Sequence, residues 1–158
     1  MPPSARVWVY QSGREFTDPE VQEILQAGDA FTNSWKAHGS ILKATFALFY
    51  KRFIVFCVDE SQHQASGCSI DKTYHFIRDM EQRHSVKLFD RMTLAYRHGS
   101  EILTTPLHDI RQSFLDGTLS KSSAVFDNTV ATVGDMRQRW EVTLEESVFM
   151  QWLDPLEV

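Results

Sequence analysis

The sequence predicts an α+β fold of the ferredoxin-like type, a β-α-β-β-α-β sandwich with both helices on one face of an antiparallel sheet. Two observations predict it: short β-branched and aromatic runs alternate along the chain with two stretches whose apolar residues recur at helical spacing, and the order of these elements is that of the split βαβ plan. We expect residues 1–105 to form this core as a single domain. Residues 106–158 are expected to form a C-terminal helical extension that packs on the core or at a dimer interface.

The first strand and the first helix have strong local signals. Residues 7–10 read Val-Trp-Val-Tyr and are followed by Ser-Gly, which is typical of a strand. Residues 17–20 read Thr-Asp-Pro-Glu, a capping box with proline in the first helical turn. Apolar residues then recur at helical spacing as far as Trp35, so we expect a helix that ends near His38-Gly39 with glycine as its C-terminal cap.

A hairpin and a second helix follow. Residues 42–49 and 53–58 are extended segments on either side of Tyr-Lys-Arg, which predicts a hairpin. After a polar loop, apolar residues at helical spacing between Ile70 and Met80 predict the second helix, with Ser69 as its N-cap. Residues 92–96 are expected to be the fourth strand of the sheet, which residues 101–104 could extend as a hairpin.

The predicted central hairpin is apolar on both of its faces. Residues 53, 55 and 57 are Phe, Val and Cys, and residues 54, 56 and 58 are Ile, Phe and Val. A sheet with helices on one face normally alternates apolar and polar residues, so the second face must also be covered. Either residues 106–158 cover it or two chains pair through it as a homodimer.

The extension carries its own helix signals. We expect short helices over residues 106–115, 134–140 and 145–153, with a loop or a strand over 120–130. Large apolar side chains in it, Trp140, Phe149 and Trp152, favour docking over a free tail.

Composition excludes several classes of function. The chain has 158 residues, a net charge of −5 and no run of Lys or Arg, so nucleic-acid binding is disfavoured. No apolar stretch is long enough to span a bilayer, and the N-terminus lacks a signal-peptide pattern. The two cysteines do not indicate a disulfide framework. We therefore expect a cytoplasmic protein.

Residues 66–71, Ser-Gly-Cys-Ser-Ile-Asp, are the stretch densest in reactive groups. In the predicted topology the segment 35–39 and the segment 59–71 lie at the same end of the sheet. That end would collect a set of candidate catalytic residues, Cys68, His38, Asp59 and Asp71, and a set of candidate ligand-binding residues, Ser66, Gly67, Ser69 and Trp35. Lys36, Lys43, His63 and His98 could lie within reach.

Two kinds of chemistry fit this set. Cys68 at a helix start would have a lowered thiol pKa, with His38 as base and Asp59 or Asp71 as orienting carboxylate. Free backbone N–H groups at the same helix start could instead bind a small anionic or carbonyl-bearing ligand. The structural alternatives are that the serines only cap and turn the chain, that Cys68 only packs, that His38 only complements a helix end, and that Asp59 is a solvated strand exit. His75, His84 and His108 fall on helix surfaces and indicate no function.

Metal and nucleotide chemistry are not predicted. Cys68 with a histidine and a carboxylate would offer suitable ligand types for zinc, but the spacing matches no standard metal motif. The phosphate-binding motif G-x-x-x-x-G-K-[ST] is absent, as are G-x-G-x-x-G and G-x-S-x-G. We therefore expect no metal, no cofactor and no P-loop ATPase activity.

Several motifs recur together in a family of small uncharacterised bacterial proteins. They are the Ala-His-Gly of residues 37–39, the Ser-Gly-Cys-Ser-Ile-Asp of residues 66–71, and the segments 88–91, 125–128 and 140–142. The chain resembles this family over most of its length, although Val148 stands where the family pattern has tryptophan after a serine. Members often carry the label "ABC transporter ATPase", which the missing phosphate loop contradicts here.

The function predicted from these observations is binding of a small ligand in a polar pocket around residues 66–71 and His38. The alternatives are a cysteine-dependent enzyme with Cys68 as nucleophile and a dimeric interaction module.

Overall fold

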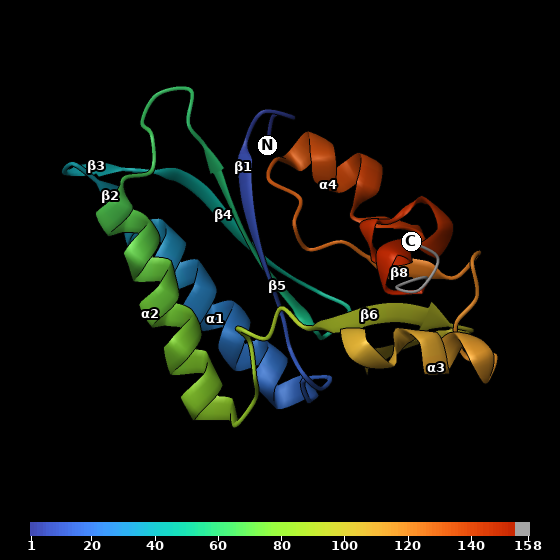
Figure 1. Cartoon of the computed structure of the whole chain (residues 1–158). Helices are drawn as coiled ribbons and strands as arrows, with labels where there is room; N and C mark the ends of the chain where they lie inside the picture. Colours follow the sequence, from blue (N-terminus) through green and yellow to red (C-terminus); the bar gives the residue numbers. More distant parts are fainter. Residues whose placement is uncertain (154–158) are drawn as a thin grey trace. The chain divides into compact units, whose positions relative to one another are not determined.

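The computed structural model describes residues 1–153, which form two compact units (Figure 1). The first unit comprises residues 1–89 and 128–137, and the second comprises residues 90–127 and, of the described chain, 138–153. The expected boundary between residues 105 and 106 falls inside the second unit, and residues 154–158 of the expected extension lie outside the described residues. The structure mixes helices and strands, which confirms the α+β class.

The first unit is built on an antiparallel three-stranded sheet with the order β1-β5-β4. Its strands are β1 (Arg6–Gln11), β4 (Lys43–Phe49) and β5 (Phe53–Asp59). Val55 in the central strand pairs with Val9 on one side and with Ala47 on the other. The predicted hairpin of β4 and β5 is confirmed.

Helices α1 (Asp18–Ser34) and α2 (Gly67–His84) lie on one face of this sheet (Figure 1). The predicted capping box begins α1: the Thr17 hydroxyl accepts a hydrogen bond from the Glu20 N–H (3.4 Å), and the Glu20 carboxylate accepts one from the Thr17 N–H (2.9 Å). The core between the helices and the sheet contains Trp35, Phe56 and Ile77, all buried.

The end of the first helix differs from the prediction. Helix α1 ends at Ser34, and Trp35 is its extended C-cap. Residues 36–41 instead form a small hairpin of β2 (Lys36–Ala37) and β3 (Ser40–Ile41). His38 and Gly39 form its turn with φ values of 50° and 82°, because a two-residue hairpin turn of this kind needs left-handed backbone at both central positions.

The predicted fourth strand forms but does not join the first sheet. β6 (Thr93–His98) pairs with β7 (Glu101–Pro106) and β8 (Ala124–Phe126) in the second unit, whose sheet has the order β7-β6-β8-β9, with β9 at Glu141–Thr143. The four-stranded ferredoxin-like sheet is therefore not formed. A strand pattern in the sequence identifies a strand but not its partner, because partners are chosen by tertiary packing.

The free edge of β1 is occupied by a later segment of the chain. The Val7 N–H donates to the Ala131 carbonyl (3.0 Å), and the Val133 N–H donates to the Ala5 carbonyl (2.8 Å). Arg6 and Thr132 form an isolated antiparallel bridge. Residues 131–133 therefore lie where the ferredoxin-like plan would place its fourth strand.

Both faces of the central strand are covered within the single chain, as its apolar pattern predicts. Phe53 and Val55 on one face and Ile54 and Phe56 on the other are at most 1% exposed. Covering the second apolar face of β5, the reason for expecting a dimer, therefore requires no second chain.

The remaining elements match the predicted helices of the extension. They are η1 (Leu107–Asp109), α3 (Ile110–Leu115), α4 (Val133–Arg139), η2 (Leu144–Glu146) and η3 (Val148–Trp152). Trp140 is buried, and Phe149 and Trp152 pack against the core of the second unit. None of the helices among residues 1–153 has both the length and the apolar composition needed to cross a membrane.

Candidate functional site

Helix α2 begins three residues earlier than predicted, with Ser66 rather than Ser69 as its N-cap. The Ser66 hydroxyl accepts a hydrogen bond from the Ser69 N–H (3.1 Å), and the Ser69 hydroxyl donates to the Ser66 carbonyl (2.8 Å). Both serines therefore hold the helix start together. Gly67 and Cys68 occupy its first turn, where both are exposed.

Cys68 is not assembled into a nucleophile–base pair. Among residues 1–153, no hydrogen bond or ion pair joins Cys68 to His38, Asp59 or Asp71. His38 is an exposed turn residue of the β2–β3 hairpin. The other cysteine, Cys57, is half-buried in β5, and burial raises the pKa of its thiol.

Asp59 at the end of β5 has a structural set of partners. One carboxylate oxygen accepts a hydrogen bond from the Ser61 N–H (3.0 Å), and the other lies 3.1 Å from Lys43 Nζ. The Ser61 hydrogen bonds, followed by Lys43, hold the pKa of the Asp59 carboxyl below its ordinary value. Asp59 therefore fixes the start of the loop that follows β5.

The predicted neighbourhood of the segments 35–39 and 59–71 is confirmed by a direct contact. The buried Trp35 donates a hydrogen bond from Nε1 to the carbonyl of Ser69 (2.8 Å). The Leu42 N–H donates to the Trp35 carbonyl (2.8 Å), which anchors the small hairpin to the same place. The end of α1 and the first turn of α2 are thus linked through one indole ring.

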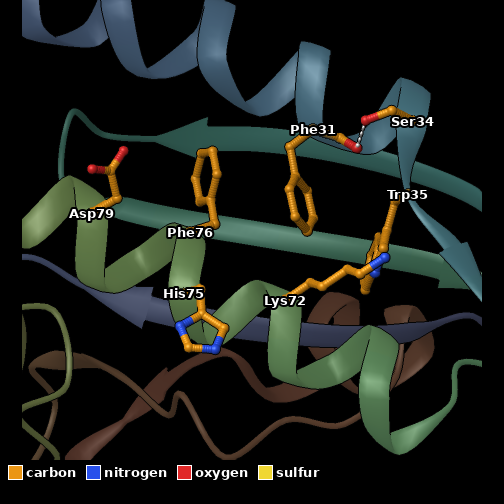
Figure 2. Close-up of a pocket in the computed structure, with 7 residues that line it drawn as sticks. All are labelled: Phe31, Ser34, Trp35, Lys72, His75, Phe76 and Asp79. Carbon is orange, nitrogen blue, oxygen red and sulfur yellow. Dashed lines mark hydrogen bonds between the residues drawn. The ribbon is translucent and has the colours of Figure 1, made fainter.

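A pocket of about 420 Å³ lies beside this link, between α1 and α2 (Figure 2). Phe31 from α1 and Phe76 from α2 point toward each other across the space between the helices (Figure 2). Its lining residues are Phe31, Ser34, Trp35, Lys72, His75, Phe76 and Asp79. Trp35, one of the predicted ligand-binding residues, lines this pocket. The first lining residue of α2 is Lys72, which directly follows the predicted catalytic residue Asp71.

The apolar part of the pocket is a set of ring contacts. The Phe31 ring lies with its centroid 5.2 Å from that of Trp35 and 5.1 Å from that of Phe76, both pairs tilted. Phe31 and Phe76 are half-buried, whereas Trp35 is 1% exposed. The rings therefore form a continuous aromatic floor that the protein only partly covers.

The charged side chains of the rim differ in their partners. His75 Nε2 lies 3.2 Å from an Asp71 oxygen, and Asp79 lies 2.9 Å from the guanidinium of Arg83. Lys72 has no ion pair or hydrogen bond among the described residues. The rim thus presents one ammonium group whose charge the described part of the chain does not neutralise.

Most of this pocket was missed by reasoning from the sequence. His75 was expected on a helix surface without a function, and Lys72 and Asp79 were not among the predicted site residues. The spacing of three and four residues between Lys72, His75 and Asp79 nevertheless places them in one row. The available signal was that Phe76, an aromatic residue, interrupts this polar row. The expectation that His84 lies on a helix surface was also wrong. His84 is buried, with Nδ1 3.4 Å from Glu20, and its Nε2 has no hydrogen-bond partner among residues 1–153.

Metal binding has no geometric basis in the described residues. Within residues 1–153, His, Cys, Asp and Glu side chains do not gather in groups of three or more that could hold an ion.

The chain has no significant match to a protein-family model, to a curated protein or to a solved structure.

Proposed function

We propose that this chain binds a small organic ligand in the pocket between α1 and α2. The observation that carries the proposal is the combination of a half-covered aromatic floor, Phe31 and Phe76, with a short row of ionisable side chains along one rim. Small-molecule sites typically combine an apolar lining with a few convergent polar groups in volumes of about 300–1,000 Å³. The pocket volume of about 420 Å³ falls in that range.

The position of the pocket supports this proposal over thiol catalysis. A thiol enzyme needs a base close to its nucleophile, and the described contacts of Cys68 include none with His38. The pocket instead has its wall fixed by the hydrogen bond from Trp35 to Ser69, so that the two helices present their rings in a defined arrangement. Preformed walls of this kind favour binding because little order has to be gained when the ligand enters.

The test is a fragment screen by ligand-observed NMR on three proteins: the wild type, Ser34→Trp and Asn33→Trp. Ser34 is an exposed rim residue whose hydroxyl bonds only to carbonyls of its own helix, so an indole there would fill the pocket without disturbing the core. Asn33 is its exposed neighbour outside the lining and is the matched control.

We expect a subset of fragments to bind the wild type and Asn33→Trp and to lose binding to Ser34→Trp. The proposal fails if no fragment binds the wild type at millimolar concentration. It also fails if the two variants bind the same fragments with equal strength.

A further inference from the structure

We infer that the ligand of this pocket is a planar aromatic acid of one or two rings, with its carboxylate at Lys72 and its ring system on Phe31 and Phe76. This inference rests on the proposed function and adds the chemical class of the ligand.

The sign of the ligand's charge follows from the ion pairs around the rim. The carboxylate of Asp79 is paired with the guanidinium of Arg83, and the Asp71 carboxylate lies 3.2 Å from His75 Nε2, so each carboxylate already has a side-chain partner. The Lys72 ammonium has no such partner among the described residues. An anion is therefore the complement that the rim lacks, and a cationic ligand would have to displace Arg83 or His75.

The shape of the ligand follows from the ring contacts. Phe31 lies between Trp35 and Phe76 at centroid separations of 5.2 and 5.1 Å, with interplanar angles of 41° and 47°. Aromatic rings favour such offset and tilted arrangements, and a flat aromatic ligand can continue the series. The Trp35 N–H is already donated to Ser69, so this residue offers only its ring surface.

The size of the ligand follows from the helix spacing and the volume. Lys72 and Phe76 are four residues apart in α2, which places their side chains next to each other on one face, about 6 Å apart at Cβ. A carboxylate attached directly to an aromatic ring, or through one carbon, spans this separation. A volume of about 420 Å³ is small for a ligand site and suits one or two rings.

Recognition of the anion must be local. The chain has a net charge of −5, so its long-range field does not attract anions. Lys72 is exposed, and its interaction with a carboxylate is therefore partly screened by salt. We expect affinity for the acid to fall as ionic strength rises, and affinity for a neutral analogue to stay constant.

The test uses two matched probes, 2-naphthoate and the neutral 2-naphthalenemethanol, titrated calorimetrically into the wild type, Lys72→Met, Lys72→Arg and Arg78→Met. Arg78 is exposed on the same helix but outside the lining, so Arg78→Met removes one positive charge without changing the pocket. Lys72→Met keeps an apolar stem of similar length, and exposure at this position makes a folding defect unexpected.

We expect Lys72→Met to weaken binding of 2-naphthoate about three- to fivefold, the upper part of the range for losing one ion pair at an exposed site. Arg78→Met should bind it within about twofold of the wild type, and Lys72→Arg, which keeps a positive charge, should bind it more tightly than Lys72→Met does. The neutral probe should not distinguish Lys72→Met from the wild type. Equal affinity of the wild type for both probes, or an unchanged affinity in Lys72→Met, would overturn the inference.

The two proposals can fail separately. If fragments bind in a manner sensitive to Ser34→Trp but 2-naphthoate shows no dependence on Lys72, the pocket is a ligand site and the acid is the wrong class. If no fragment is sensitive to Ser34→Trp, the pocket itself is not a binding site and both proposals fall.

Discussion

Gly28 in α1 packs directly against the ring of Phe46 in β4. A Cβ atom built on Gly28 would overlap the ring of Phe46, so the absence of a side chain sets the distance between the helix and the sheet. We predict that Gly28→Ala lowers the free energy of unfolding by about 1–3 kcal/mol because the Phe46 ring must move in a packed core. Chemical denaturation measures this change.

The control for this prediction is Gly67→Ala in the first turn of α2. Apart from its chain neighbours and the backbone of its own helix, no atom of the described residues lies within 4 Å of a Cβ at Gly67. This change should therefore alter the unfolding free energy by less than about 0.5 kcal/mol. Equal effects of the two substitutions would contradict the packing explanation.

Glu20 joins the start of α1 to Arg14 and Thr17, which precede the helix, and to His84 of α2. Its carboxylate accepts hydrogen bonds from Arg14 (2.8 Å at each oxygen) and from the Thr17 N–H. The bond from Arg14 first, and then that from the Thr17 N–H, lower the pKa of Glu20 from 4.5 to about 2. Because the folded-state pKa is the lower one, these contacts stabilise the fold above about pH 4.5. This stabilisation is lost as the pH falls from there toward about 2.

We predict that Glu20→Gln lowers the free energy of unfolding at pH 7 by about 1 kcal/mol or more. The difference from the wild type should shrink as the pH falls from about 4.5 toward 2. Denaturation at a series of pH values measures it, with the exposed Glu23→Gln as control. A difference that stays constant across this pH range would show that the ionised carboxylate is not what stabilises the helix start.

At the scale of elements, α2 depends on its N-cap more than on its first-turn side chains. Ser66 provides the cap, and Gly67 and Cys68 are exposed. We predict that Ser66→Ala lowers the free energy of unfolding by about 1 kcal/mol and that Ser66→Asp restores most of it, since aspartate also caps helices. Cys68→Ser should leave stability nearly unchanged. A large loss for Cys68→Ser in the same denaturation measurements would mean that Cys68 packs rather than faces solvent.

The elements that the sequence predicted best are those with local causes. The capping box at Thr17 and the hairpin of β4 and β5 are determined within a few residues, and both are confirmed. The predicted position of the end of α1, near His38-Gly39, was wrong because Ala37 and Gly39 are compatible with either a helix end or a turn. The helix ends before Trp35, whose ring is buried in the core and donates a hydrogen bond to the Ser69 carbonyl.

At the scale of the whole molecule, each unit is made of segments that are distant in the sequence. Residues 128–137 belong to the first unit, where the Val7 and Val133 N–H groups donate to Ala131 and Ala5. We predict that these two amides exchange with solvent as slowly as amides inside the sheet. Hydrogen exchange measured by NMR would test this, with the exposed residues 62–64 as the fast reference. Fast exchange at both positions would mean that residues 131–133 do not stay on the edge of β1.

Local sequence signals account for the α+β class, the central hairpin and the capping box, because each follows from backbone preferences and apolar spacing within short windows. The neighbourhood of Trp35 with the start of α2 was predicted from the expected order of elements rather than from any local pattern. Only the tertiary structure decided that residues 131–133 line the edge of β1, that β6 pairs elsewhere, and that the pocket lies between the two helices beside Phe31 and Phe76. The physical reason is that partner choice and side-chain convergence depend on contacts between distant segments, whose free energies no local pattern contains.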